Sequence, residues 1–536
     1  MKPLNLVALD LNWKLAVKRL RQDVQDDFWP DPFRYEDLLR SCARDLASVS
    51  SVLEDFQPRR GTPSAIPKAN LTIRDSIQLT GLDRLVYQAL ADKLSAALDP
   101  CLCPRVFSHR LRSPDHKFMF HSGVQRWKSF LDAVKTALRD QPQAYLVITD
   151  VTHYFEAIRY SVLRKQLENV IGETQRSDLL PCANALMSCL YAWSPYNGYG
   201  LAQNIDASSF LGNILLDGVD RLMEREGFPM FRYMDDIRIV VPTEADARIA
   251  LMKLVAHLRD LGLGLNAAKT ELLAPGSAEM ERHLRDEDPE IASIEKAVGE
   301  KTQEAAQNIV DILFGKTERL IETRQVGERS FRFCLNRIVS FRRYKNLRLP
   351  DGSDITDSVL KLLVTRPAET LTFCSYLEVA PFEERHTSEL CRLLISEPLL
   401  VYSWQKYHLW RIAAQRKVKH GDLARRAHEV ISADPNDPAA AGASLYLGSQ
   451  GDYADRQVIG KAVQFLSSAL SCRCFRVGAQ ELHPSERSRA YESGSPDTEN
   501  GILGDHIQSL NEPVYAAHPA EIGIDELPDT MPSVYA

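Results

Sequence analysis

The spacing of apolar residues changes several times along the chain, and each change predicts a different kind of element. Residues 1–59 have helical spacing, with Trp13, Val17 and Leu20 as apolar positions among charged ones. A short hairpin and then a helix over Gly81–Leu98 are expected next. The first part of the chain therefore predicts helices with little strand.

Two segments further along have the spacing of strands. Leu146–Ile148 is a short apolar run that suits a buried central strand. Phe231–Val241 is apolar or β-branched on both sides of Asp235 and Asp236, as in a hairpin with acids in its tight turn. Beyond about residue 276 helical spacing returns, and short helices without a clean repeat are expected as far as residue 480.

The adjacent acids at Asp235 and Asp236 are the first sign of chemistry. Two like charges are costly to bury side by side unless a cation compensates them. Mg²⁺ takes carboxylate and phosphate oxygens, and paired Mg²⁺ ions serve in-line nucleotidyl transfer. The simpler alternative is a surface Asp-Asp turn. A third carboxylate, Asp150, stands at the end of the predicted central strand, although alone it is better explained as a helix N-cap.

Four motifs in a fixed order resemble those of reverse transcriptases. Asp150 with Phe155 is similar to motif A, and Tyr233–Asp236 is similar to motif C, which reads Tyr-x-Asp-Asp. Motifs B and D are represented by Gly200–Asn204, Ser208, Leu211, Asn213, Leu261–Asn266 and Lys269–Thr270. Several matches in order are far more specific than one, and two fingers segments add to these four.

The fingers segments are Ile66–Lys68 with Arg74, and Val106–Arg110. The resemblance covers roughly residues 60 to 275 and implies an α+β right-hand polymerase followed by an all-α C-terminal domain. The expected domains are a helical segment 1–59, fingers 60–140, palm 141–275, thumb and linker 276–345, an all-α domain 346–480 and a poorly ordered tail 481–536.

The resemblance also implies roles for individual residues. Asp150, Asp235 and Asp236 would hold two Mg²⁺ ions, with Mn²⁺ as an alternative, and Lys269 would serve the pyrophosphate leaving group. Lys68 and Arg74 would neutralise the triphosphate, since arginine offers a bidentate fork. The remaining assignments are Phe155 as steric gate against a 2′-hydroxyl, Gln203 to the nucleotide, and Arg105, Arg110 and Tyr233 to nucleic acid.

One departure from the family pattern lies in motif B. Ala202 and Asn204 replace the usual Pro and Gly, which removes a fixed φ and a permissive backbone position. This substitution puts in doubt how conventionally the pocket handles template and nucleotide.

Composition narrows the remaining choices. The 536 residues are 44% hydrophobic and 26% charged, which is ordinary for a soluble globular protein of two or three domains. No long apolar run and no signal-peptide pattern are present, so we expect a cytoplasmic protein without a membrane span. The ten scattered cysteines predict reduced thiols and no structural metal.

The net charge of −7 is unusual for an enzyme that follows nucleic acid, because phosphate contacts supply most non-specific affinity. Basic residues do cluster between Arg329 and Lys345, interleaved with aromatic residues. Such a cluster suits a single strand, and it equally suits a basic helix face with core aromatics.

The subtype rests on the family resemblance alone. An altered motif B, no nuclease and a helical extension resemble bacterial abortive-infection and defence-associated reverse transcriptases, which are associated with phage defence and homo-oligomers. We expect dNTPs, a single-stranded DNA product or RNA template, and synthesis that can dispense with a template, primed by a hydroxyl such as that of Tyr515 or Tyr535. The alternatives are a retron-like polymerase with a dedicated RNA, or an idle nucleic-acid-binding scaffold.

Overall fold

The computed structural model describes residues 3–44, 52–284, 288–492 and 498–527. The chain forms two compact units. The first unit comprises residues 1–27, 41–63 and 76–286. The helical unit comprises residues 28–40, 64–75 and 287–536. Each unit is described by itself below.

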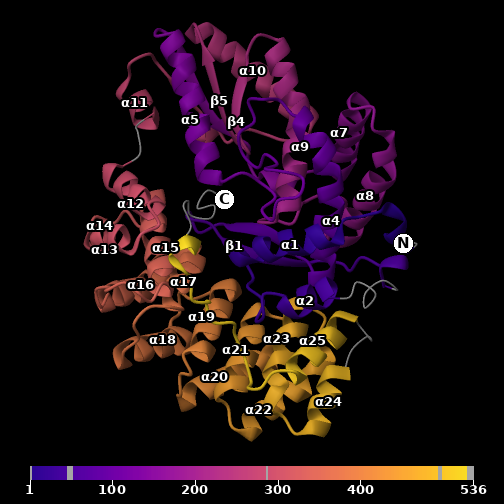
Figure 1. Cartoon of the computed structure of the whole chain (residues 1–536), viewed down its shortest axis with the longest axis vertical. Coiled ribbons are helices and arrows are strands. Elements are labelled where there is room, and N and C mark those ends of the chain that lie inside the picture. Colours follow the sequence, from indigo (N-terminus) through magenta and orange to yellow (C-terminus); the bar gives the residue numbers. More distant parts are fainter. Residues whose placement is uncertain (1–2, 45–51, 285–287, 493–497, 528–536) are drawn as a thin grey trace. The chain divides into compact units, whose positions relative to one another are not determined.

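The first unit combines one small sheet with several helices (Figure 1). Two elements at its margins, β1 (Thr62–Pro67) and β2 (Ile73–Gln78), pair as a hairpin whose tip belongs to the helical unit. The other elements are α1 (Trp13–Asp23), α4 (Gly81–Leu98), α5 (Gly123–Asp140), β3 (Tyr145–Asp150), α6 (Tyr154–Ala157), α7 (Tyr160–Glu173), α8 (Leu180–Trp193), α9 (Asp206–Arg225), β4 (Met230–Tyr233), β5 (Asp236–Val241), α10 (Glu244–Asp260), β6 (Glu271–Leu273) and α11 (Ala278–Leu284).

The four-stranded antiparallel sheet has the strand order β4-β5-β3-β6. Strand β3 is internal because Leu146 and Val147 are fully buried, as the apolar run predicted. In Figure 1, β4 and β5 lie between α5 and α10. Helix α5 packs through Trp127 and Phe130 against Tyr233 and the Arg238 guanidinium of this sheet.

The helical unit contains the C-terminal half of the chain. Its helices are α12 (Pro289–Gly299), α13 (Gln303–Asn308), α14 (Val310–Glu322), α15 (Arg329–Arg343), α16 (Ser353–Thr365), α17 (Thr370–Leu377), α18 (Glu384–Ser396), α19 (Ser403–Gln415), α20 (Gly421–Ala433), α21 (Pro438–Gln450), α22 (Tyr453–Ala462), α23 (Ala469–Gly478), α24 (Pro484–Glu492) and α25 (Thr498–Gln508), while α2 (Glu36–Arg44) is divided between the units.

Small residues bring the central helices of this unit into backbone contact. A Cβ added at Gly442 of α21 would lie 2.8 Å from the Tyr407 carbonyl oxygen in α19. A Cβ at Gly478 of α23 would lie 2.5 Å from the Ser444 carbonyl oxygen in α21. Glycine at these positions is required by close approach, not by an unusual φ.

An N-terminal segment is embedded in the helical unit. The indole of Trp404 donates to the Phe28 carbonyl at 2.7 Å, and the hydroxyl of Tyr407 donates to the Pro30 carbonyl at 2.6 Å. The contacts therefore group residues 28–40 with the C-terminal helices, whereas the sequence pattern places them in a domain of residues 1–59.

The cluster between Arg329 and Lys345 lies in and just after α15. Phe331 and Phe341 are fully buried in the core of the helical unit, and Arg337 is buried with them. Arg332 pairs with the Glu369 carboxylate at 2.6 Å. The structure thus favours the core-helix interpretation over a single-strand platform for these aromatic residues.

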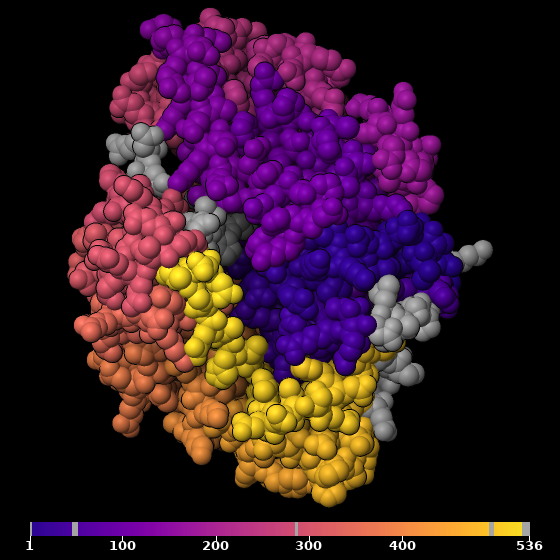
Figure 2. Space-filling view, in the orientation of Figure 1, coloured from indigo at the N-terminus to yellow at the C-terminus, as the bar shows by residue number. Residues whose placement is uncertain are grey.

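The segment after residue 481 is expected from its composition to be poorly ordered, but much of it is helical. Helix α24 buries Ala490, and α25 buries Leu503 and Ile507, against neighbouring helices. The following residues run over the surface of the helical unit as the yellow segment in Figure 2, where Ile522 donates to the Arg343 carbonyl at 3.2 Å. Tyr535 lies outside the described residues.

No helix in the described part of the chain is both long and apolar enough to cross a membrane.

Candidate active site

The register of the sheet brings the predicted acids together. Asp150, the last residue of β3, pairs directly with Asp236, the first residue of β5. Directly opposed residues on neighbouring strands share a face of the sheet, so these two carboxylates are neighbours. Asp235 directly precedes Asp236 and is the second residue of the two-residue loop that joins β4 to β5 after Tyr233. Met234, the other loop residue, has a φ of +58°, a strained backbone typical of functional turns.

The charges at this site are incompletely balanced. Lys269 Nζ donates to Asp150 Oδ2 at 2.6 Å, while Asp150 Oδ1 is buried with no partner among the described residues. Burial, reinforced by the negative charge of Asp236 and then that of Asp150, raises the pKa of Asp235 to about 6. The site therefore holds more buried negative charge than Lys269 alone neutralises.

These features suit a divalent cation. The donors are carboxylate oxygens, one of them unpaired, and hard cations such as Mg²⁺ prefer such donors. Within the described residues, no three acidic, histidine or cysteine side chains already converge as a complete ligand set. Mg²⁺ usually keeps waters and takes substrate phosphates beside one or two carboxylates, so a partial protein ligand set is compatible with it.

The motif D segment is tied to the end of β3 by its backbone. The Asn266 amide donates to the Asp150 carbonyl at 2.9 Å, and the Thr152 amide donates to the Gly264 carbonyl at 2.8 Å. This pairing delivers Lys269 to the acids, and hydrogen bonding with Asp150 raises the pKa of the lysine further. The ammonium head is thus held charged beside Asp150 although its side chain is 69% exposed.

A buried arginine that the sequence analysis did not single out supports the acidic turn. Arg232 is completely buried and forms a fork with Asp220, with the shortest N–O distance at 2.6 Å. Its Nη1 also donates to the Asn213 side-chain oxygen and to the Met234 carbonyl, each at 2.9 Å. Its only sequence signal is a charged residue at an apolar strand position, directly before Tyr233.

Phe155, the predicted steric gate, lies in α6 and is partly buried. Its carbonyl accepts a hydrogen bond from the Leu201 amide at 2.9 Å, which links motif A to motif B. A Cβ added at Gly212 of α9 would lie within 3.3 Å of Tyr154, Phe155 and the Met234 sulfur. Gly212 therefore allows the gate and the acidic turn to pack on the same helix.

Gln203 and Asn204 follow in the motif B loop. The Gln203 side chain is buried and donates to Glu156 Oε1 at 3.4 Å, and Glu156 also pairs with His153. Asn204 has a φ of +59°, a conformation that asparagine tolerates better than most residues. Its side chain also donates to the Asp26 carbonyl. The replacement of glycine by asparagine therefore preserves the left-handed backbone at this position.

Lys68 and Arg74, predicted to bind triphosphate, lie at the tip of the β1–β2 hairpin and belong to the helical unit. The Lys68 amide donates to the Thr72 carbonyl at 2.7 Å, which closes the tip. The Arg74 guanidinium lies 5.8 Å from the centroid of the Phe28 ring. Their predicted contact with nucleotide stays a prediction.

The three residues predicted to bind nucleic acid all have internal partners. Arg105 pairs with Glu224 at 2.6 Å, and Arg110 pairs with Asp99 at 3.2 Å while donating to backbone carbonyls. The hydroxyl of Tyr233 donates to the Gly123 carbonyl at 3.0 Å. These contacts give each residue a structural role, and the nucleic-acid role stays a prediction.

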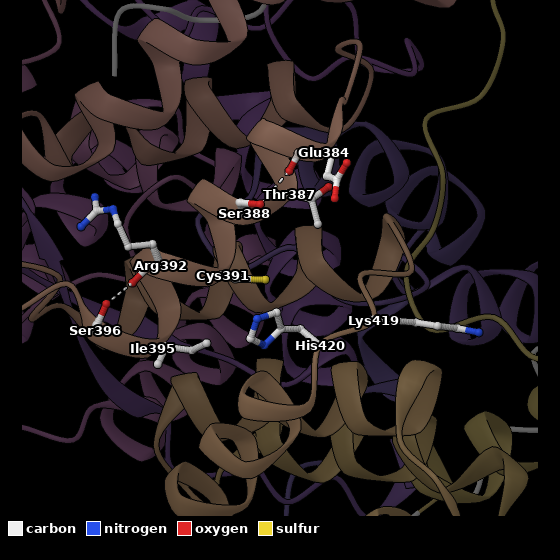
Figure 3. A pocket seen from close by; sticks show the side chains of 9 residues that line it. All are labelled: Glu384, Thr387, Ser388, Cys391, Arg392, Ile395, Ser396, Lys419 and His420. Carbon is white, nitrogen blue, oxygen red and sulfur yellow. Dashed lines mark hydrogen bonds between the residues drawn. The ribbon is translucent and has the colours of Figure 1, made fainter.

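A cavity of about 490 Å³ lies in the helical unit between α18 and the loop before α20 (Figure 3). The hydroxyls of Ser388 and Ser396 donate to carbonyls of their own helix. Arg392 is held by Glu389 and Glu397, and in Figure 3 its charged end and that of Lys419 lie at opposite edges. We assign no ligand to this cavity.

Comparison with known proteins agrees with the geometry of the acids. Residues 66–312 match the family model described as "Reverse transcriptase (RNA-dependent DNA polymerase)". The chain contains a reverse transcriptase domain. The expected α+β polymerase fold with a helical C-terminal region is confirmed, and so is the class of enzyme, an RNA-directed DNA polymerase. The matched span stops within α14, so most of the helical unit lies beyond it.

Similar solved structures include three of telomerases. Apo telomerase from Candida tropicalis is 12% identical over 78% of this chain and 69% of its own, with a TM-score of 0.33. The same telomerase truncated from the C-terminal domain is 13% identical over 42% of this chain and 52% of its own, with a TM-score of 0.29. Telomerase from Candida albicans, in complex with a fragment of telomeric RNA, is 11% identical over 90% of this chain and 71% of its own, with a TM-score of 0.30. The chain thus spans about half the length of the truncated telomerase. Among the curated proteins no relative matches.

Proposed function

We propose that this protein is a DNA polymerase of the reverse transcriptase type that acts in antiphage defence, by abortive infection. The observation that supports catalysis best is the pairing of Asp150 with Asp236, with an unpaired buried oxygen on Asp150 and Lys269 beside it. An idle scaffold has no need for uncompensated buried carboxylates, which are destabilising.

In the proposed reaction Asp150 and Asp235 would hold two Mg²⁺ ions, and Asp236 would add negative charge. The bound ions would stabilise the attacking 3′-hydroxyl oxygen and the leaving pyrophosphate. Lys269, kept charged by Asp150, would neutralise or protonate the leaving group. Phe155 would lie against the sugar and select deoxynucleotides. Lys68 and Arg74 would hold the β- and γ-phosphates.

The defence role follows from the resemblance of the motifs, and the helical region that follows the polymerase domain in sequence is compatible with it. The defence-associated reverse transcriptases that the motifs resemble are associated with homo-oligomers, so we propose a homo-oligomer here as well. The protein-primed, untemplated form of the proposal needs an accessible hydroxyl. Tyr515 is half-buried and donates to Glu481 at 2.7 Å, which makes it a poor primer in this conformation.

The test incubates purified protein with Mg²⁺ or Mn²⁺ and each dNTP, without added nucleic acid. Products that are sensitive to both protease and DNase are expected, and Asp235→Ala should abolish them. Strict dependence on added RNA, or on a defined RNA that copurifies, would replace untemplated synthesis by copying. Phage resistance that survives Asp235→Ala would contradict a catalytic role altogether.

A further inference from the structure

An aromatic loop beside the reverse transcriptase site has no role in the proposed chemistry. It runs from Trp193 to Gly200, directly before the motif B segment. The rings of Tyr196 and Tyr199 are stacked, with centroids 5.3 Å apart and planes only 13° from parallel. Tyr199 is 42% exposed, and Tyr191, at the end of α8, is 43% exposed. Tyr196 is partly buried, so the loop presents the Tyr199 ring to solvent with the Tyr196 ring stacked against it.

Hydrogen bonds from the buried residues at its start hold the loop in one conformation. Ser194 is buried, and its hydroxyl lies 2.9 Å and 3.0 Å from the carbonyl oxygens of Tyr196 and Tyr199 while accepting from the Tyr196 amide at 3.1 Å. Trp193 anchors the loop by donating to Asp83 at 2.6 Å. The tyrosines therefore lose little further conformational entropy if a ligand stacks on them.

The loop is also joined to the active-site segment. The Gly200 amide donates to the Ile158 carbonyl at 3.0 Å, and the Tyr160 amide donates to the Gly198 carbonyl at 2.9 Å. Phe155 and Leu201 are paired one step closer to the acids. The tyrosine loop therefore continues directly into the segment beside the acids. A strand of nucleic acid that passes the acids would also pass the tyrosines.

Two exposed arginines add positive charge. Arg60 donates to the Pro195 carbonyl at 2.7 Å, so its guanidinium lies at the edge of the loop. Arg159 forms a bridge with Tyr199 through its backbone, and its guanidinium lies over Gly262. Because the whole chain carries a net charge of −7, local cations such as these are needed to attract phosphates.

We infer that Tyr196 and Tyr199, with Arg60 and Arg159, form a stacking platform for single-stranded nucleic acid next to the polymerase site. Aromatic faces bind bases of any sequence, while arginines contact the backbone. This inference rests on the proposed polymerase function, because that function supplies the strand.

The test measures binding of labelled oligo(dT) and oligo(U) by fluorescence anisotropy, without dNTPs or Mg²⁺. Tyr199→Ala and Tyr196→Ala should each weaken Kd about tenfold, since one stacking contact is lost. Tyr199→Phe keeps the ring and should bind as the unaltered protein does. Tyr453→Ala, an equally exposed tyrosine of the helical unit, is the matched control and should change nothing. The two oligonucleotides decide whether DNA or RNA is preferred.

A second measurement does not depend on substitution. Photocrosslinking of an iodouridine-containing strand to the unaltered protein should label Tyr196 or Tyr199. Arg60→Gln should reduce the slope of log Kd against log salt concentration by about one, because one phosphate contact is lost. Unchanged Kd in both alanine variants, or crosslinks only elsewhere, would overturn the platform. If Asp235→Ala leaves synthesis intact while the alanine variants lose binding, the proposed function fails and the platform stands.

Discussion

Buried carboxylates occur in both units of this protein, but their surroundings differ. In the helical unit, Asp31 and Asp37 are fully buried and receive four hydrogen bonds from Arg473, between 2.5 and 3.1 Å long. In the first unit, Asp150 receives one hydrogen bond from an exposed lysine and keeps an unpaired oxygen. The first arrangement is complete without a ligand, and the second gains from an added cation.

The difference teaches how to separate structural from catalytic acids. A buried acid that is satisfied by a planar, rigid guanidinium fixes the fold. A buried acid that is left partly unsatisfied costs stability, and such a cost is characteristic of functional sites. Substitutions in the two groups should therefore act on different measurements.

The largest effect is expected at the acidic turn. Asp235→Asn should lower polymerase activity by about 10³-fold or more, because charge stabilisation of the transition state is lost. The same change should raise the melting temperature in the absence of metal, since it removes a desolvated charge. Synthesis assays and thermal melts on one preparation measure both.

The pH dependence of that stability gain follows from the pKa of Asp235, which is raised to about 6. In the native protein the raised pKa makes the carboxyl a destabilising charge above pH 6, while below about pH 4 both native and unfolded forms are protonated. The gain in stability from Asp235→Asn should therefore be full at pH 7.5 and vanish as the pH falls from 6 to 4. A gain that is independent of pH would contradict the burial of this charge.

The second largest effect is expected in the helical unit. Arg473→Met removes the guanidinium that pairs with two buried acids and should lower the free energy of unfolding by about 3–5 kcal/mol. Arg105→Met breaks a half-exposed pair with Glu224 and should cost only about 0–1 kcal/mol. Urea unfolding of both variants tests the contrast, and similar losses would show that burial does not separate the pairs.

A smaller effect is expected where α9 contacts the acidic turn. Gly212→Ala places a methyl group within 3.3 Å of Phe155 and Met234, so both side chains must move by a few tenths of an ångström. We expect a loss of about 1–2 kcal/mol in stability and a larger proportional loss in kcat than in dNTP affinity. Gly172→Ala has open space around its Cβ and serves as the control.

The smallest effect is expected at Asn204. Asn204→Gly suits the positive φ but loses the side-chain hydrogen bond to Asp26, so stability should change by less than about 1 kcal/mol. Asn204→Val places a β-branched residue in the left-handed region and should cost about 1–3 kcal/mol. Equal melting temperatures for the glycine and valine variants would contradict a backbone requirement here.

The local patterns of this sequence were good predictors of the sheet. Strand β3 and the hairpin with Asp235 in its turn both follow from short runs whose neighbours are close in the chain. The α+β fold with a helical C-terminal region followed from the order of motifs and from helical spacing. The roles assigned to the individual site residues stay predictions.

Other features were beyond the reach of sequence patterns. Arg232 lies on a strand, and its partners Asp220 and Asn213 lie on the helix that precedes this strand in the chain. Periodicity does not reveal which of these polar residues meet. The pairing of Asp31 with Arg473 joins residues that are far apart in the chain. Helices α24 and α25 occur in a segment of low apolar content because packing of a few residues outweighs composition.

By itself the sequence predicted which residues would carry the chemistry, because acids, lysine and turn residues appear in short motifs with fixed spacing. It also determined where strands and helices form, because period and propensity act over a few residues. Only the tertiary structure decided which buried charges are paired and which are not, and that the aromatic residues of α15 are core while Tyr199 faces solvent. Burial and pairing depend on contacts between segments distant in the chain, which no local pattern encodes.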